Sequence, residues 1–288
     1  MVDWPPDQAN NAPIGIFDSG VGGLTILTEL LRELPDERYV YFGDTGNCPY
    51  GVRTEREIQT LSAAATRFLL AQRAKLIVVA CNTASVWARR SLRATFTLPI
   101  VVVVPAIKPA AAHTRTGKVG IASTEASARG AYLRQLIREH AGDTDVQVVG
   151  CPRLVELAEA GQLDGPAVEA AVRAYIAPLL AAGIDQLVLG CTHFPAMRAV
   201  FERVAGPAVT VIDSGEAIAR RARAVLTQRQ LLAAPQSGPA ATPRPPRPTD
   251  TFWCSGDAAP FARVAQAILG HPVTVHQVPG MVQALATG

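Results

Sequence analysis

The stretch LIVVACNTAS, residues 76–85, decides how the rest of the chain is interpreted. Its first five residues, 76–80, form an apolar run with the length and composition of a buried strand. Cys81 follows this run directly, and Asn82 and Thr83 begin a polar turn. In α/β proteins ligands bind at the carboxyl ends of the strands, so a thiol at this place is a candidate for chemistry.

Similar apolar runs recur along the chain and alternate with amphipathic segments. We expect buried strands at residues 14–17, 39–42, 76–80, 100–104, 119–122, 146–149, 187–189 and 209–212. One face of a helix is marked by Leu24, Leu27, Leu31 and Leu34. The tetrad TERE, Thr54–Glu57, is a capping box that begins a second helix ending near Gln72. This alternation predicts an α/β fold with mainly parallel sheets that helices cover on both faces.

The chain also carries a weak internal repeat. The stretch LVLGCTHFPA, residues 187–196, again places an apolar strand before a cysteine, a threonine and a helix start. Upstream of each cysteine lies a strand that ends in hydroxyl or carboxylate residues, IGIFDSG from Ile14 and VGIASTE from Val119. The matching points are offset by about 105 and about 110 residues, so the repeat predicts two similar doubly wound domains.

We place the domain boundaries between these repeated units. The first domain is expected to be discontinuous and to comprise residues 1–98 and 207–288, and the second to comprise residues 99–206. Because such sheets bind ligands at the carboxyl ends of their strands, the expected active site is the cleft between the two domains. Cys81 and Cys191 would then face each other across that cleft.

Two facing thiols are suited to one particular reaction. A thiolate is favoured at a helix N-terminus, and Cys81 and Cys191 both precede an expected helix. One thiolate can remove a proton from one side of a carbon while the other thiol returns a proton to the opposite side, which inverts the stereocentre. A single cysteine after a strand is most often a packing residue, but two at matching points of a repeat favour chemistry. A supporting role is open to Cys48, whereas Cys151 and Cys254 are expected to pack.

The composition narrows the choice of cofactor and partner. None of the three lysines, Lys75, Lys108 and Lys118, lies in an obvious cofactor pocket, so a pyridoxal Schiff base is not expected. No HxH, HExxH or carboxylate cluster suggests a catalytic metal, and we expect no cofactor. The net charge of +3 is spread along the chain, and no basic stripe with interleaved aromatic residues indicates a nucleic-acid partner.

The sequence favours a cytoplasmic setting. The apolar runs of the 288-residue chain are all shorter than a membrane span. The first residues, MVDWPPDQANNAP, lack the basic start and the apolar run of a signal peptide. The five cysteines lie far apart and form no CxxC pair.

The segment AAPQSGPAATPRPPRPTD, residues 233–250, differs from the rest of the chain. Six prolines in eighteen residues prevent regular structure, so we expect a mobile surface insertion rather than a docking motif. Residues 251–288 are too few to fold alone. They offer a strand, TFWC, and a helix near residues 260–269, which should pack back on an earlier domain.

Five segments together resemble a known family, the bacterial glutamate racemases. They are GIFDSGVGGLT (15–25), FGDTGNCPYG (42–51), VVACNTAS (78–85), LGCTHFP (189–195) and SGD (255–257). The resemblance covers roughly residues 13–232 and 251–270. The CNTA and CTH segments alone are typical of the wider aspartate/glutamate racemase superfamily, and the DSGVGG and PYG segments narrow the resemblance to glutamate.

The resemblance implies a cofactor-independent, two-base racemase in the cytoplasm that makes D-glutamate for peptidoglycan, and a homodimer is common in such families. It places Cys81 on the D-glutamate face of the substrate and Cys191 on the L-glutamate face. It implies that Asp18 and His193 assist as acid/base groups, and that Glu159 is a further catalytic carboxylate. The chain departs from the family pattern in CPRLVELAE, which has Glu156 where the pattern has proline, in VVPAIKPAAA and in the proline-rich insertion.

The resemblance also implies the residues that bind glutamate, namely Asp18, Ser19, Tyr50, Gly51, Asn82, Thr83, Thr192 and His193. These assignments agree with the chemistry of the substrate, which needs donors at both carboxylates and an acceptor at its ammonium group. Backbone N–H groups at helix starts can hold one carboxylate together with nearby hydroxyl and amide side chains. Tyr50 and the backbone of Gly51 could hold the other carboxylate, and Asp18 could pair with the ammonium group.

Simpler interpretations of these residues remain open on the sequence alone. Asp18 and Ser19 could merely cap a helix, and the glycines of DSGVGG could bind a phosphate. His193 could be a hydrogen-bonded core residue and Glu159 a solvated one. The alternative enzymes are an aspartate or hydantoin racemase and a cysteine hydrolase using Cys191 and His193. A non-catalytic two-lobed binding protein is a third class, but it would have no reason to place a thiol on each lobe.

Overall fold

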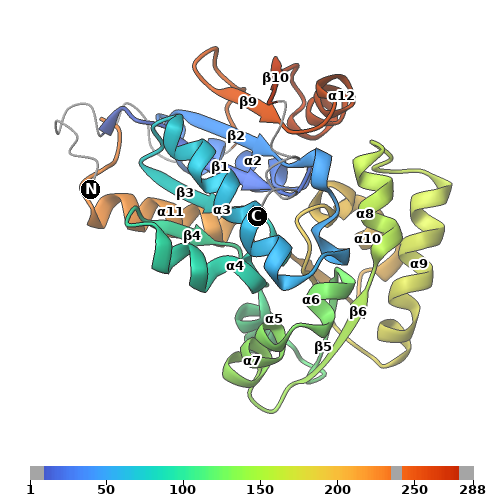
Figure 1. Ribbon diagram of the computed structural model, residues 1–288. Helices are drawn as coiled ribbons and strands as arrows, with labels where there is room; N and C mark the ends of the chain where they lie inside the picture. The colour runs from blue at the N-terminus through green and yellow to red at the C-terminus, as the bar shows by residue number, and fades with distance from the viewer. Residues whose placement is uncertain (1–9, 235–241, 279–288) are drawn as a thin grey trace.

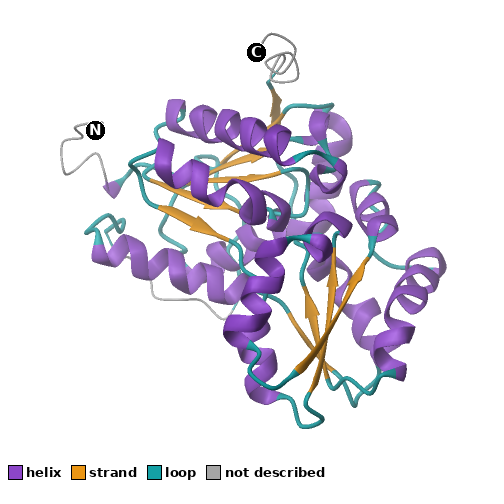
Figure 2. Ribbon diagram, turned by 60° about the horizontal axis from the view of Figure 1, so that its bottom comes forward, coloured by secondary structure: helices purple, strands orange, loops and turns teal. Residues whose placement is uncertain are grey.

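The chain folds into two lobes, each built on its own parallel sheet (Figure 1). The computed structural model describes residues 10–234 and 242–278. Every strand pair within these residues is parallel, and helices lie on both faces of the sheets (Figure 2). The predicted α/β class is therefore confirmed. Over the same residues, no helix has the length and apolar character needed to cross a membrane.

The first sheet has six strands in the order β10-β9-β2-β1-β3-β4. Their bounds are β1 Ile14–Asp18, β2 Tyr39–Gly43, β3 Leu76–Val79, β4 Ile100–Val102, β9 Thr251–Cys254 and β10 Val275–Gln277. The expected strand TFWC is thus β9, which pairs with β2 and returns the last part of the chain to the first lobe. The short edge strand β10 was not predicted, because only one of its three residues, Val275, is apolar.

The second sheet has four strands in the order β6-β5-β7-β8. Their bounds are β5 Lys118–Ser123, β6 Asp145–Gly150, β7 Gln186–Leu189 and β8 Thr210–Ile212. The order β2-β1-β3-β4 within the first sheet is the same as β6-β5-β7-β8, so the internal repeat of the sequence corresponds to a repeated topology. The carboxyl ends of the second sheet point towards the first lobe (Figure 2).

Sheet membership differs from the expected domain boundaries at two strands. Strand β4 pairs with β3 in the first sheet, although residues 99–206 were assigned to the second domain. Strand β8 pairs with β7 in the second sheet, although residues from 207 onward were assigned to the first. The division into two domains stays a prediction, and strand pairing favours boundaries just after β4 and just after β8.

Helices pack on both faces of each sheet. Those near the first sheet are α2 Leu24–Glu33, α3 Glu55–Ala71, α4 Asn82–Thr95, α11 Gly215–Gln228 and α12 Ala258–Leu269. Those near the second are α5 Ile107–His113, α6 Glu125–Arg129, α7 Ala131–His140, α8 Pro152–Glu159, α9 Pro166–Ala181 and α10 Arg198–Ala205. Three short 3-10 turns complete the described elements, η1 Thr45–Asn47, η2 Tyr50–Val52 and η3 Phe194–Met197. The predicted capping box of α3 is present, because Thr54 and Glu57 exchange side-chain and backbone hydrogen bonds.

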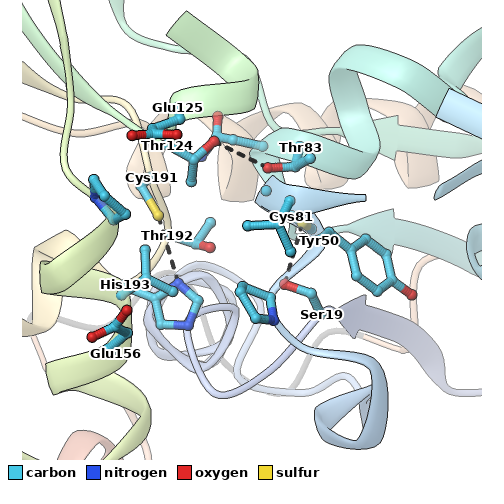
Figure 3. A pocket seen from close by; sticks show the side chains of 16 residues that line it. Ser19, Tyr50, Cys81, Thr83, Thr124, Glu125, Glu156, Cys191, Thr192 and His193 are labelled. Carbon is cyan, nitrogen blue, oxygen red and sulfur yellow. Dashed lines mark hydrogen bonds between the residues drawn. The ribbon is translucent and has the colours of Figure 1, made fainter. Parts of the chain in front are cut away.

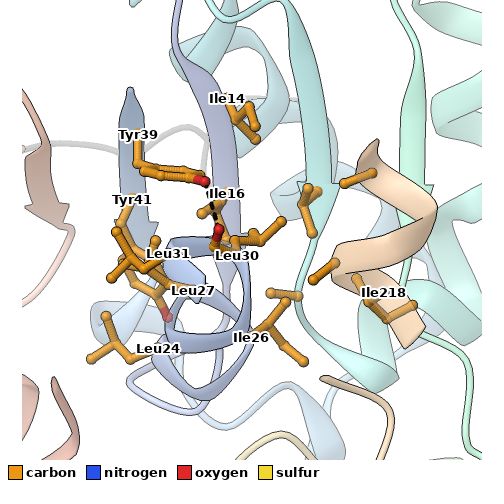
Figure 4. Close-up of a cluster of buried hydrophobic side chains, with 14 of the residues drawn as sticks. Ile14, Ile16, Leu24, Ile26, Leu27, Leu30, Leu31, Tyr39, Tyr41 and Ile218 are labelled. Atoms are coloured by element: carbon orange, nitrogen blue, oxygen red, sulfur yellow. Dashed lines mark hydrogen bonds between the residues drawn. The ribbon is translucent and has the colours of Figure 1, made fainter. Parts of the chain in front are cut away.

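The central strands are apolar on both faces, which is why helices cover both. In β1, Ile14 and Ile16 join the cluster under α2 and α11, whereas Phe17 joins the cluster under α3 and α4. Successive side chains of a strand point to opposite faces, so a continuous apolar run needs two covers. The predicted leucine face of α2 is buried against this sheet (Figure 4).

The proline-rich segment has no helix or strand in its described part, residues 233–234 and 242–250, as predicted. The expected mobility stays a prediction, although several contacts hold residues 242–250 against the first lobe. The guanidinium of Arg244 donates to the backbone carbonyls of Pro35 and Glu37, pairs with Asp250 at 2.7 Å, and lies over the ring of Tyr39. An arginine fork offers five donors, so this one side chain fastens the segment to the start of β2. Residues 235–241 of the predicted insertion lie outside the described part of the chain.

Candidate active site

A cavity of about 80 Å³ lies between the lobes, at the carboxyl ends of strands from both sheets. A buried water needs about 10–15 Å³ on the same measure, so this space holds several waters and suits a small molecule. Nine residues predicted for the site line it: Ser19, Tyr50, Gly51, Cys81, Asn82, Thr83, Cys191, Thr192 and His193. Two predicted residues do not line the cavity, since Asp18 and Glu159 lie behind the lining residues.

The two thiols lie on opposite sides of this cavity (Figure 3). Cys81 follows β3 of the first lobe, and Cys191 follows β7 of the second lobe, the repeat partner of β3. Both side chains are almost fully buried, at 4% and 3% exposed, so the cavity is the space their sulfur atoms share.

Cys81 occupies the N-cap of α4. Its sulfur accepts a hydrogen bond from the backbone N–H of Ala84 at 3.4 Å, and its thiol donates to Ser19 Oγ at 3.6 Å. Ser19 in turn donates to Asp18 Oδ1 at 3.2 Å. Burial, and next the charge of Asp18, raise the pKa of the Cys81 thiol to about 12, although the N–H of the helix start opposes this. In this arrangement Cys81 carries its proton at neutral pH.

Cys191 belongs to a second chain of contacts. Its sulfur lies 3.5 Å from His193 Nδ1, and His193 Nε2 lies 2.5 Å from Glu159 Oε1. Burial alone would lower the pKa of His193, but the hydrogen bonds with Cys191 and Glu159 raise it well above its usual value. A protonated His193 can stabilise a thiolate at Cys191. His193 is therefore a buried residue tied to the thiol, not a histidine that only packs in the core.

Glu159 is the last residue of α8 and reaches back to the first lobe. Its Oε1 also accepts the backbone N–H of Val21 at 2.9 Å. Burial acts to raise its pKa, but the hydrogen bond from His193 and the other donors lower the pKa overall. The alternative of a solvated helix residue is excluded by these contacts, and Glu159 connects the lobes through His193 and Val21.

Asp18 ends β1 and is fully buried. Its Oδ1 accepts the N–H of Gly20 at 2.8 Å, and its Oδ2 accepts the hydroxyl of Thr192 at 2.9 Å across the two lobes. Burial raises its pKa, although the charge of His193 and these hydrogen bonds act in the opposite direction. Asp18 is not the cap of α2, because the N-cap is Gly23 and no side chain caps that helix.

The glycines of DSGVGG allow the backbone of the first lobe to approach side chains of the second lobe closely. A Cβ on Gly20 would lie 1.9 Å from Glu159 Oε1, and a Cβ on Gly22 would lie 2.6 Å from His193 Nδ1. Both distances are shorter than a van der Waals contact, so a side chain at either position would have to displace the carboxylate of Glu159 or the ring of His193. These contacts explain the glycines without a phosphate.

The loop from Asp44 to Gly51 is held from the C-terminal part of the chain. Asp44 accepts hydrogen bonds from Tyr50 OH at 2.6 Å, Ser255 Oγ at 2.6 Å and Asn47 Nδ2 at 3.0 Å. The hydroxyl of Tyr50 therefore points away from the cavity, and its expected side-chain contact with a substrate carboxylate is not available (Figure 3). Tyr50 and Gly51 therefore present only backbone groups to a substrate carboxylate in the cavity. The SGD segment, residues 255–257, helps to hold this loop, because Ser255 donates to Asp44.

Several lining residues were not predicted, and four of them are Thr124, Glu125, Pro152 and Val155. Thr124 accepts or donates a hydrogen bond with Thr83 at 3.2 Å, which joins the two lobes beside Cys81. The internal repeat could have predicted Thr124 as a lining residue, since it occupies the position in VGIASTE that Ser19 occupies in IGIFDSG of the first lobe. Glu156, the residue at the usual proline position, also lines the cavity and pairs with Arg153 at 2.7 Å.

Sequence comparison agrees with this geometry. The profile of the family described as Asp/Glu/Hydantoin racemase matches residues 19–222. A glutamate racemase of Herpetosiphon aurantiacus is 46% identical over 256 residues, which are 89% of this chain and 97% of the relative. The chain belongs to the glutamate racemases.

Solved structures of other glutamate racemases share the fold. That of isoform RacE1 from Bacillus anthracis has a TM-score of 0.81 at 31% identity, covering 93% of this chain and 98% of its own. That from Escherichia coli, in complex with L-glutamate and the activator UDP-MurNAc-ala, has a TM-score of 0.79 at 33% identity, with the same coverage. Family membership therefore extends over both lobes and the cavity between them.

Proposed function

We propose that this chain interconverts L-glutamate and D-glutamate by two-base proton transfer in the cavity between the lobes. The observation that carries the proposal is the position of the two thiols, one from each lobe, on opposite sides of one small cavity. Each thiol is also linked to a buried carboxylate, Cys81 through Ser19 to Asp18 and Cys191 through His193 to Glu159. Family membership supplies the substrate, and the geometry supports the mechanism.

The reaction from L- to D-glutamate needs one proton removed and one added. The thiolate of Cys191 takes the α-proton, and the electron pair of the broken C–H bond spreads into the α-carboxylate. The thiol of Cys81 then gives its proton to the opposite face of the α-carbon. Afterwards Cys191 is a thiol and Cys81 a thiolate, which is the form that the reverse reaction requires. Each step is general acid–base catalysis by a group within reach of the carbon.

The carboxylates of the substrate would be held by neutral donors. Asn82 and Thr83 begin α4, where free backbone N–H groups favour an anion, and Thr192 follows Cys191 in the other lobe. The backbone at Tyr50 and Gly51 would hold the second carboxylate. The hydroxyl of Ser19 lies on the side of Cys81, where a substrate ammonium group would find an acceptor, and Asp18 lies behind it as the acceptor of the Ser19 hydroxyl. No added cofactor enters this scheme.

The proposal includes the pathway that the product supplies and the oligomeric state of the protein. D-glutamate made by this reaction would supply peptidoglycan biosynthesis in the cytoplasm, as in the family. We also propose a homodimer, which light scattering coupled to size-exclusion chromatography would test. A monomeric mass at working concentration would contradict it.

The reaction is tested by proton NMR of L-glutamate in deuterated water, with the purified protein, EDTA and no added cofactor. We expect the α-proton signal to disappear and the product to reach equal amounts of L- and D-glutamate, because enantiomers have the same free energy. Exchange with aspartate or a hydantoin but not with glutamate would keep the mechanism and replace the substrate. Absence of exchange with all three would contradict the proposal and favour the cysteine hydrolase.

A further inference from the structure

Tyr41 is a fully buried tyrosine next to the site that the proposed proton transfers do not use. It lies in β2, and it is not among the residues that line the cavity. Its hydroxyl donates a hydrogen bond at 2.9 Å to the carbonyl of Gly20, in the turn between β1 and α2. A carbonyl oxygen can only accept, so the hydroxyl is the donor in this contact.

The hydroxyl of Tyr41 is held in place by the packing of its ring. The ring centroid lies 6.4 Å from that of Phe252 in β9 and 6.0 Å from that of Phe261 in α12. The ring also belongs to the apolar cluster under α2 and α11 (Figure 4). Side chains in such a core occupy fixed rotamers, so the core of the first lobe fixes the position of this donor.

The carbonyl that Tyr41 contacts belongs to the same peptide group as the N–H of Val21. The peptide bond between Gly20 and Val21 is trans, so its C=O and its N–H point in opposite directions. The carbonyl accepts from Tyr41, and the N–H donates to Glu159 Oε1 of the second lobe at 2.9 Å. Because a peptide group is planar and rigid, a contact that fixes the carbonyl also aims the N–H. Hydrogen bonds in series also polarise one another.

The contacts continue from Glu159 to the reacting thiol. Glu159 Oε1 lies 2.5 Å from His193 Nε2, and His193 Nδ1 lies 3.5 Å from the sulfur of Cys191. A donor to the charged form of a carboxylate favours that form, and a charged Glu159 favours a protonated His193. The orientation of one peptide group in the first lobe therefore bears on the base in the second lobe.

We propose that Tyr41 is a positioning residue for racemisation, which aims the peptide group between Gly20 and Val21 at Glu159. The carboxylate is thereby held on His193, beside the thiol of Cys191. The inference rests on the proposed function. Because Tyr41 lies outside the cavity, its effect on the reaction is transmitted through this peptide group and the carboxylate.

Tyr39 offers a matched control two residues earlier in β2. It is 1% exposed, and its hydroxyl donates to the carbonyls of Leu30 and Leu34 near the end of α2, at 2.9 and 2.7 Å. Tyr41→Phe and Tyr39→Phe each remove one buried hydroxyl from the same face of the same strand. We expect both variants to fold and to unfold a few degrees below the unchanged protein.

The kinetic test compares these two variants. We expect Tyr41→Phe to lower kcat by about 10-fold with KM little changed, because the contact acts on the base and not on the substrate. Tyr39→Phe should keep kcat within about twofold, since its hydroxyl does not reach the site. Unchanged kcat in Tyr41→Phe, or an equal loss in both variants, would overturn the inference.

A second measurement reads the chain of contacts without turnover. Nitrogen-15 NMR of the histidine rings in the free protein follows the titration of His193, assigned with His193→Gln. Ionisable groups that interact by charge with Glu159 or His193 include Asp18, Cys48 and Cys191. Tyrosine and phenylalanine are both neutral in the range of the titration, because burial raises the pKa of Tyr41 well above its usual value. The substitution therefore changes none of these charges.

We expect Tyr41→Phe to lower the pKa of His193, with a loss of about threefold in its affinity for the proton, and Tyr39→Phe to leave it unchanged. An unchanged titration of His193 in Tyr41→Phe would refute the role of Tyr41, even if the protein is an active racemase. A shifted titration in a protein without any racemisation would instead refute the proposed function and, with it, the role in racemisation.

Discussion

At the scale of single residues, the two thiols have equivalent places but unequal surroundings. Cys81 is linked to its carboxylate through a hydroxyl, which transmits hydrogen bonding but carries no charge of its own. Cys191 is linked through an imidazole whose pKa is raised well above its usual value, so a positive charge lies 3.5 Å from the sulfur. A neighbouring cation favours a thiolate, whereas burial beside Asp18 favours a thiol. The two surroundings thus differ in charge, with a cation beside Cys191 and a carboxylate near Cys81.

This asymmetry predicts a specific phenotype for single cysteine variants. Cys81→Ala and Cys191→Ala should each lower racemisation by at least about 100-fold, because one of the two acid/base groups is missing. The remaining thiol can still exchange the α-proton of the enantiomer that it faces. In deuterated water we expect Cys81→Ala to exchange only L-glutamate and Cys191→Ala only D-glutamate, as measured by proton NMR on each enantiomer.

The control for these variants is circular dichroism, which should show both folds intact. Near-normal racemisation in either variant would falsify the two-base assignment. Exchange of the opposite enantiomer by each variant would exchange the faces assigned to the two thiols.

At the scale of elements, the turn between β1 and α2 brings the two lobes together. The turn contributes the N–H of Val21 to Glu159, and the carbonyl of Thr192 accepts the hydroxyl of Thr25 from the start of α2 at 3.0 Å. Such contacts require a backbone without side chains at the closest points, which is why Gly20 lies under the carboxylate of Glu159. The short loops that follow β1, β3 and β7 therefore fix the catalytic geometry more than any one helix does.

Gly20→Ala tests this role of the turn. Its new Cβ would overlap Glu159 Oε1, so the carboxylate must leave its contacts with Val21 and His193. We expect kcat to fall at least about 10-fold while the thermal unfolding temperature changes by only a few degrees. In a Glu159→Ala background the same substitution should cost little further activity, because the atom it displaces is absent. Independent losses that multiply in the double variant would disprove the contact.

At the scale of the whole molecule, local sequence signals predicted most of the architecture. Apolar runs located the strands around β1, β3, β5 and β7, and the repeated strand–cysteine order located both thiols. Contacts between residues far apart in the chain could not be predicted from local sequence patterns. Ser255 reaches Asp44 across 211 positions of the chain, and Arg244 reaches Glu37 across 207. The assignment of β4 and β8 to their sheets depends on strand pairing in the same way, so the sequence pattern alone did not show which sheet each of these strands joins.

One buried ion pair connects four distant segments of the chain. Lys75 Nζ lies 2.6 Å from Glu37 Oε2, with side chains only 3% and 2% exposed. The same lysine donates to the carbonyl of Asn10, and Glu37 Oε1 accepts the N–H of Ala233. Burial raises the pKa of Glu37 and lowers that of Lys75, while their attraction opposes both shifts. The pair therefore holds these segments together, and removing either side chain leaves the charge of the other buried without a partner.

Lys75→Met should destabilise the protein by about 3–5 kcal/mol at pH 8, as measured by urea unfolding, because the charge of Glu37 is left without its partner. Without Lys75, the folded-state pKa of Glu37 rises further above its unfolded value. Between the unfolded and the folded pKa of Glu37, the folded state holds a proton that the unfolded state has released. The stability of this variant should therefore fall as pH rises from about 5 to 8. The double variant Lys75→Met, Glu37→Leu should recover most of the loss and lose this pH dependence. Equal stability of the single and double variants at pH 8 would show that the buried carboxylate is not the cause.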